Sequence, residues 1–243
     1  TGKLKEPGFL QLRATYRPSP KAPGINALAG AAIDPLEIPA SHTVPDDFDE
    51  FWTSQKAKLA QVPLDVQLTS VPSNSKTVES FDLQAMCVGA PVSGYLARPL
   101  DAAPKSLPII LTVHGAGVRS SGLGSAVNWA AKGYLAMDMN AHGIPNGKPE
   151  VFYKDLTEGE LKDYRAMGRD SRDTCYFGGM FLRLVRAIDV LTAQPQWDGK
   201  TVVVLGSSQG GYQAIVAAGL DSRVTFFSAG VPAGCDHTGM LAK

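Results

Sequence analysis

A serine set between two glycines has the spacing of a nucleophile for acyl transfer. Gly206, Ser208 and Gly210 occupy alternate positions in the chain. Five β-favouring residues precede them at 201–205, and a mostly small and apolar segment follows at 212–219. A serine on a sharp turn between a strand and a helix presents its hydroxyl at the top of a sheet. We therefore predict that Ser208 is a nucleophile.

The two flanking glycines have a predicted role of their own. A side chain at Gly206 or Gly210 would collide with the neighbouring strand or helix, and glycine tolerates the unusual dihedral angles of such a turn. The same pattern also arises by chance in a chain with 25 glycines, so the predicted strand and helix around it are what favour the nucleophile. Ser207 is the weaker candidate, because the glycine frame centres on Ser208.

Acyl transfer also needs N–H donors for the oxyanion. The run His-Gly-Ala-Gly at 114–117 follows a continuous apolar strand predicted over 107–113. In this architecture the loop at that position supplies one backbone donor, and the residue after the serine supplies the other. We predict that these donors are the N–H groups of Ala116 and Gln209.

The base and the acid of a catalytic triad are harder to place. They are expected after the nucleophile, where the acids are Asp221 and Asp236 and the histidine is His237. Asp236 is badly placed to orient the histidine next to it in the chain, so His237 is a weak candidate for the base. We expect the acid and the base on two further strand units beyond Lys243. We also expect this chain by itself to be nearly inactive, since a serine without its base is a weak nucleophile.

Other motifs give no second chemistry. We interpret His114 as structural, and Asp138 and His142 as structural or as lining the mouth of the site. The histidines and cysteines lack metal-type spacing. The glycines at 115 and 117 lack the third glycine of a dinucleotide site, and Lys200 lacks the upstream glycine of a phosphate loop. The sequence therefore predicts neither a cofactor nor a metal.

The elements that position these residues follow an α/β pattern. Three antiparallel strands come first, at 66–71, 78–88 and 92–98. Buried strands then alternate with helices, the strands at 107–113, 134–139, 201–205 and 224–230 and the helices at 125–132, 179–193 and 212–219. We expect one mostly parallel sheet whose strand ends share a mouth.

The chain divides into three predicted parts. Residues 1–22 are a short β segment, either docked or the end of an upstream β domain, and residues 23–45 are a proline-rich linker. Residues 46–243 form the α/β domain, which we expect to be incomplete at its C-terminal end. Its first helix starts with the capping-box pair Asp47 and Glu50. The long polar segment at 140–174 is expected to be an insertion near the mouth.

Composition limits the class of partner. The chain is 44% hydrophobic and 19% charged with a formal net charge of zero, so it lacks the basic footprint of a nucleic-acid binder. No apolar stretch is long enough for a membrane span. We interpret Cys87, Cys175 and Cys235 as small buried hydrophobic residues. The oligomeric state is left open, and a homo-oligomer is compatible with the sequence.

Four phrases resemble the acetyl xylan esterase and cephalosporin-C deacetylase family of α/β-hydrolases, over residues 45–236. They are Pro-Asp-Asp-Phe-Asp-Glu-Phe-Trp at 45–52, Gly-Tyr-Leu-Ala-Arg-Pro at 94–99, Gln-Pro-Gln-Trp-Asp at 194–198 and Ser-Gln-Gly-Gly at 208–211. The resemblance implies an α/β-hydrolase fold, with helices on both faces of a mostly parallel sheet that is truncated before its last two strands. It also implies a serine esterase that removes O-acetyl groups from acetylated xylo-oligosaccharides or similar small acetate esters through an acyl-enzyme on Ser208.

One departure from the family concerns substrate preference. Where the family has Arg-Gly-Gln-Gly, this chain has Ala-His-Gly-Ile at 141–144. Two alternatives stay open: a hydrolase of another ester or of a peptide, and a catalytically inactive carbohydrate-binding protein on the same fold. The resemblance favours an extracytoplasmic setting, periplasmic or secreted, without fixing the compartment.

Overall fold

The structure is a computed structural model that describes residues 3–40 and 42–234. The chain divides into two compact units, one up to Pro45 and one from Asp46. The first unit holds an antiparallel hairpin of β1 (Gly8–Tyr16) and β2 (Ile25–Ile33), followed by the short 3-10 helix η1 (Pro35–Glu37).

Strand β2 corrects one prediction. Residues 25–33 were expected inside the proline-rich linker at 23–45, but they pair with β1 along its whole length. The prolines of that stretch, at 23, 35, 39 and 45, all lie outside the strand. The run between them keeps its backbone N–H groups and can therefore form a ladder with β1.

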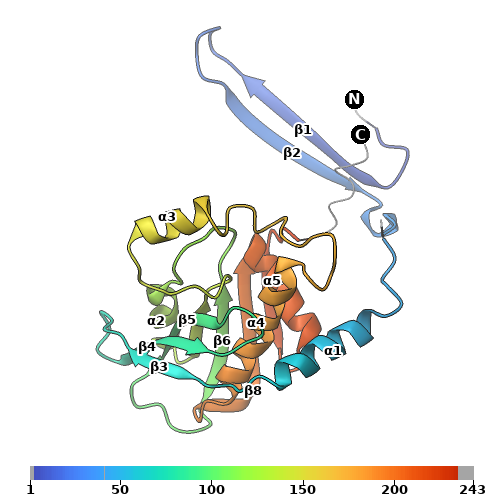
Figure 1. Cartoon of the computed structure of the whole chain (residues 1–243). Helices are drawn as coiled ribbons and strands as arrows, with labels where there is room; N and C mark the ends of the chain where they lie inside the picture. Colours follow the sequence, from blue (N-terminus) through green and yellow to red (C-terminus); the bar gives the residue numbers. More distant parts are fainter. Residues whose placement is uncertain (1–2, 41, 235–243) are drawn as a thin grey trace. The chain divides into compact units, whose positions relative to one another are not determined.

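The second unit is built on a seven-stranded sheet in the order β3-β4-β5-β7-β6-β8-β9 (Figure 1). The pairs joining β7, β6, β8 and β9 are parallel, and those joining β3, β4, β5 and β7 are antiparallel. The strands are β3 (Gln67–Ser70), β4 (Val78–Ala85), β5 (Val92–Pro99), β6 (Leu107–Val113), β7 (Leu135–Met139), β8 (Trp197–Ser207) and β9 (Phe226–Gly230). The sheet is thus mixed, with its antiparallel strands on one side as the sequence predicted.

Helices cover both faces of this sheet. Successive residues of β6 point to opposite faces. Ile109 packs in the core that α1, α4 and α5 share, whereas Ile110 packs with Ala126 and Ala130 of α2. The helices are α1 (Phe48–Ala60), α2 (Leu123–Ala130), α3 (Glu150–Glu158), α4 (Tyr176–Thr192) and α5 (Gln209–Leu220).

The first helix starts at the predicted place but without the predicted capping box. Asp47 is the residue before α1, yet its side chain makes no capping hydrogen bond. Its carboxylate instead accepts two hydrogen bonds from Arg172, one of them at 2.7 Å. The Arg172 guanidinium, which also lies 4.7 Å from the centre of the Phe51 ring, lowers the pKa of Asp47 by this hydrogen bonding. A charge-assisted pair has therefore replaced the helix cap.

The polar segment after β7 contains a helix that the sequence did not reveal. Residues 150–158 form α3, and a series of tight turns follows it. Tyr153 is the one residue of α3 that is buried. The apolar residues of this helix, at 151–153 and 156, span less than two turns inside a charged stretch, which is why its periodicity was not evident.

Two cysteines and the membrane question can be settled for the described part of the chain. Cys87 is buried and Cys175 is half-buried, and both are free thiols. Burial raises the pKa of Cys87. Cys235 lies outside the described residues. No helix in the ranges 3–40 and 42–234 has the length and apolar character needed to cross a bilayer.

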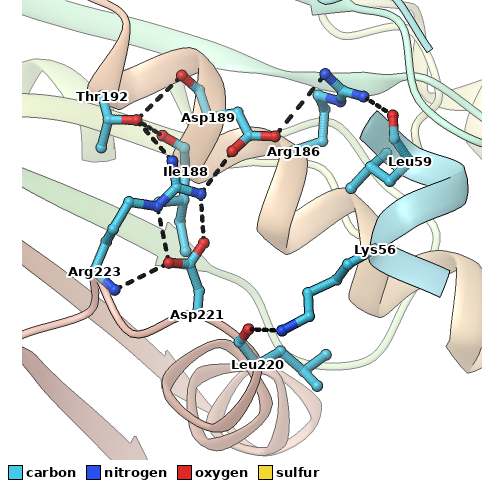
Figure 2. Close-up of polar contacts among 9 residues, drawn as sticks. All are labelled: Lys56, Leu59, Arg186, Ile188, Asp189, Thr192, Leu220, Asp221 and Arg223. Carbon is cyan, nitrogen blue, oxygen red and sulfur yellow. Dashed lines mark hydrogen bonds and ion pairs between the residues drawn. The ribbon is translucent and has the colours of Figure 1, made fainter. Parts of the chain in front are cut away.

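A network of ion pairs joins the end of α4 to the loop before β9. Arg223 donates to Asp189 at 2.6 Å, to Asp221 at 2.6 and 2.9 Å, and to the Thr192 hydroxyl at 3.1 Å (Figure 2). Asp221 is 6% exposed. These hydrogen bonds raise the pKa of Arg223, and they balance a carboxylate that has little contact with water.

Replacing Arg223 should therefore destabilise the fold. We expect Arg223→Met to lower the free energy of unfolding by about 1–3 kcal/mol, because it leaves Asp221 buried without its partner. Urea denaturation at neutral pH measures the change. Lys154→Met is the control, since Lys154 lies 3.8 Å from Glu158 with both side chains 66% exposed. That exposed pair should contribute less than about 0.5 kcal/mol, and equal losses in the two variants would contradict the prediction.

Candidate active site

Ser208 stands on a strained turn between β8 and α5. Its backbone has φ 56° and ψ −122°, and α5 begins at the next residue. A positive φ is unusual for serine and stores strain that the surrounding structure must hold. The Ser208 N–H donates to the carbonyl of Gly230 at the end of β9, at 2.9 Å. This is the backbone geometry by which a nucleophile elbow exposes its hydroxyl.

The glycines on either side are required by close backbone contacts. A Cβ at Gly206 would lie 2.1 Å from the carbonyl oxygen of Gly210, and a Cβ at Gly210 would lie 2.2 Å from that of Val113. Both distances are far shorter than any van der Waals contact. The first turn of α5 can therefore approach β8 and β6 only because these positions carry no side chain.

The loop at 114–117 lies against the serine. A Cβ at Gly115 would be 3.5 Å from the Cβ of Ser208. Ala116 and Gln209 line one cavity of about 400 Å³ together with Phe177 and Tyr212. Neither the N–H of Ala116 nor that of Gln209 has an acceptor among residues 3–40 and 42–234. The fold thus brings the two predicted donors to the same space next to Ser208.

Side chains hold the carbonyl groups of this loop. The carbonyl of Gly115 accepts from His114 Nδ1 at 2.6 Å and from Arg119 at 3.4 Å, and that of Ala116 accepts from Arg119 at 3.1 Å. The carbonyl of Gly115 and the N–H of Ala116 share one trans peptide plane and point in opposite directions. Fixing that carbonyl therefore fixes the direction of the N–H. Sequence reasoning missed Arg119, because no spacing pattern connects it to the loop.

His114 and Asp138 have the structural surroundings that the sequence suggested. Burial lowers the pKa of His114, and Nδ1 carries its proton because a carbonyl can only accept. The carboxylate of Asp138 accepts from the Thr112 hydroxyl and from the N–H of Gly122, both at 2.7 Å. These contacts tie β6, β7 and the start of α2 together.

His142 is a neutral histidine near the same loop. It is 2% exposed, and its pKa is lowered to about 4, chiefly because burial disfavours the charged form. Its ring lies 6.5 Å from that of His114, centre to centre. At neutral pH it acts through hydrogen bonds and carries no charge.

The partners of a triad are not assembled within the described part. Among residues 3–40 and 42–234, no side chain forms a hydrogen bond with the Ser208 hydroxyl. Asp221 caps the other end of α5, about 18 Å away along a 12-residue helix, and is held by Arg223. Asp236 and His237 lie outside the described residues. The same described ranges contain no group of three His, Cys, Asp or Glu side chains that could hold a metal ion.

Comparison with known proteins relates this site to one enzyme family. A family model described as acetyl xylan esterase (AXE1) matches residues 36–242. The acetyl esterase Axe7A of Xylanibacter ruminicola is 32% identical over 251 residues, an alignment that covers 99% of this chain and 54% of that protein. The chain therefore spans about half the length of this curated relative.

Solved structures agree on the fold. The acetyl xylan esterase from Paenibacillus sp. R4 superposes with a TM-score of 0.72 at 25% identity, covering 84% of this chain and 65% of that one. Acetyl xylan esterase 1 from a Thermoanaerobacterium species gives a TM-score of 0.71 at 23% identity, with 83% and 63% covered. The α/β-hydrolase fold predicted from the sequence is thereby confirmed.

Proposed function

Since the chain belongs to the acetyl xylan esterase family, we propose that it carries the nucleophile and the oxyanion hole of a serine esterase. The substrates are O-acetylated xylo-oligosaccharides or similar small acetate esters. The observation that supports this most is a strained Ser208 next to Ala116 and Gln209, two residues that line one cavity and whose N–H groups have no acceptor among residues 3–40 and 42–234.

The reaction follows from that arrangement. The Ser208 hydroxyl attacks the acetyl carbonyl carbon and passes its proton to a base that we expect outside the described residues. The electron pair of the carbonyl moves onto oxygen, and the N–H groups of Ala116 and Gln209 donate to the oxyanion. As the oxyanion collapses, the base gives its proton to the sugar oxygen, the C–O bond to the sugar breaks, and the sugar alcohol leaves acetyl-Ser208 behind. Water then attacks this ester, and acetate is released as the serine is restored.

The cavity supplies a surface for the substrate. Phe177 and Tyr212 give it apolar aromatic walls, and the exposed side chain of Arg165 lies on its lining. Its volume of about 400 Å³ exceeds what an acetyl group fills, which leaves room for part of a sugar ring. Arginine N–H groups are suited to bind the hydroxyl groups of that ring.

Ser208→Ala tests the assignment in the full-length protein. We expect acetate release from acetylated xylo-oligosaccharides to fall by roughly 10⁴-fold or more, because the acyl-enzyme cannot form. Labelling by a fluorophosphonate should be lost in parallel. Ser207→Ala is the matched control and should change the rate by less than about threefold, since the glycine frame centres on the next residue.

Two other outcomes are informative. Retention of acetate release by Ser208→Ala would disprove the proposed nucleophile. If Ser208→Ala abolishes labelling but the wild type releases acetate from no acetylated sugar, the serine is a nucleophile and the substrate is another ester.

A further inference from the structure

Three aromatic side chains, two of them buried and one half-buried, form one cluster near the proposed oxyanion hole. They are His142, Tyr164 and Tyr176, and we call them the support cluster. The His142 ring lies 4.6 Å from that of Tyr164, edge to face, and 5.9 Å from that of Tyr176, centre to centre. The two tyrosine rings lie 5.5 Å apart. Tyr176 begins α4, and the other two residues come from the polar segment after β7.

The first link runs from this cluster to Gln209. The Tyr164 hydroxyl donates to Gln209 Oε1 at 2.7 Å, and both residues are buried. The other end of the same amide, Nε2, lies 3.8 Å from the sulfur of Met180. The Gln209 side chain is thus held at both ends. This restrains the first residue of α5, which lines the cavity.

The second link runs from the cluster to the loop that carries Ala116. His142 Nε2 lies 3.2 Å from the carbonyl oxygen of Gly117, so Nε2 must carry the proton. Nδ1 is then the acceptor, and the Tyr176 hydroxyl donates to it at 2.7 Å. The two contacts fix the tautomer and the orientation of the ring.

Gly117 is the part of the loop that most needs such support. Its φ is +127°, a conformation open to glycine and rarely adopted by other residues. Glycine is also the least restricted residue in the unfolded and loop states. A hydrogen bond to the Gly117 carbonyl removes that freedom. It therefore restrains the loop one residue after Ala116, whose N–H is the proposed donor.

We infer that His142 and Tyr164 are positioning residues that hold the two oxyanion donors in register with each other. The inference rests on the proposed function. His142 donates a hydrogen bond to the loop that carries Ala116, and Tyr164 donates one to Gln209. The rings of His142 and Tyr164 pack directly together. The contact between the two rings therefore joins the loop that carries Ala116 to the first residue of α5. Loss of one oxyanion donor typically costs about 10²–10³ in kcat, so a misplaced donor should reduce kcat and leave KM nearly unchanged.

Tyr164→Phe tests the first link in the full-length protein. It keeps the ring against His142 and removes the hydroxyl that holds Gln209. We expect kcat to fall about 10- to 100-fold while KM changes less than about threefold. Tyr153→Phe is the matched control: Tyr153 is a buried tyrosine of the same segment whose hydroxyl donates to the carbonyl of Pro145 at 2.9 Å. It should lower the melting temperature without lowering kcat.

His142→Gln and His142→Leu test the second link. Glutamine retains an N–H donor that can reach the carbonyl of Gly117, whereas leucine does not. We expect kcat to rank wild type, then glutamine, then leucine, with a difference of about tenfold or more between the last two. Should the leucine variant fail to fold, Tyr164→Phe and His142→Gln still decide the matter.

The outcomes separate the two proposals. If Tyr164→Phe and His142→Leu lower the melting temperature as Tyr153→Phe does but keep the wild-type kcat, the support cluster is only part of the core and the inference is wrong. If Ser208→Ala abolishes hydrolysis in the same assay, the proposed function stands regardless of that result. If Ser208→Ala retains hydrolysis, the proposed function itself fails.

Discussion

Gly206→Ala should lower the free energy of unfolding by about 4 kcal/mol or more, one of the largest effects of a single methyl group in this chain. The added Cβ would lie 2.1 Å from the oxygen, 2.3 Å from the carbon and 2.9 Å from the Cα of Gly210. All three are backbone atoms, so no side-chain rotation can relieve the overlap. The start of α5 would have to move away from β8, and Ser208 and Gln209 would move with it.

Urea denaturation together with fluorophosphonate labelling measures both consequences. Gly219→Ala is the matched control, because Gly219 lies in the same helix and an added Cβ would have no atom within 4 Å. There alanine should be neutral or stabilising by up to about 1 kcal/mol, as expected for an exposed helical site. If the two alanine variants were equally stable and equally labelled, the close packing of the turn would be disproved.

Acidification should weaken the fold through His142. Its pKa is about 4 in the folded state against 6.5 for an ordinary histidine. Between these pH values His142 binds a proton in the unfolded chain but not in the folded one. Its contribution to the free energy of unfolding is therefore fully present above about pH 6.5 and falls as the pH approaches 4. The pKa difference corresponds to a loss of up to about 3 kcal/mol. Protonation would also remove the hydrogen bond that the Tyr176 hydroxyl donates to Nδ1, because both ring nitrogens would then be donors.

Comparison with His142→Gln isolates this contribution. The free energy of unfolding is measured for both proteins from pH 7 to pH 4, and the wild type minus the variant is followed. Titrating groups that do not interact with His142 act in both proteins and cancel in this difference. We expect the difference to fall by up to about 3 kcal/mol across the range. A difference that stays constant with pH would show that the folded and unfolded states bind this proton equally well.

Most of the architecture could be predicted from local patterns in the sequence. The continuous apolar run at 107–113 coincides with β6, and the helix predicted at 179–193 corresponds to α4 at Tyr176–Thr192. The glycine frame around Ser208 encodes part of its own geometry, because the tight contact between Gly206 and Gly210 joins residues four positions apart. Such features were readable because their determinants lie close together in the chain.

The missed features depend on contacts between distant positions. Asp47 has the spacing of a helix cap, but its carboxylate is bound by Arg172, 125 residues later. Tyr164 lies in a charged, turn-rich stretch without periodicity, and its partner Gln209 is 45 residues away. No local pattern of residue types distinguishes a tyrosine that faces solvent from one that folds back onto the site. The support cluster could therefore be found only in three dimensions.

The positive φ of Ser208 lowers stability at the residue whose hydroxyl the proposed chemistry requires. A non-glycine residue held in such a conformation costs on the order of 1–3 kcal/mol, and glycine would adopt it without that cost. Selection for stability alone would thus favour glycine at this position, and the hydroxyl would be lost. Under the proposed function, serine at 208 marks a trade-off in which part of a small stability margin is given up to keep a nucleophilic hydroxyl at this turn.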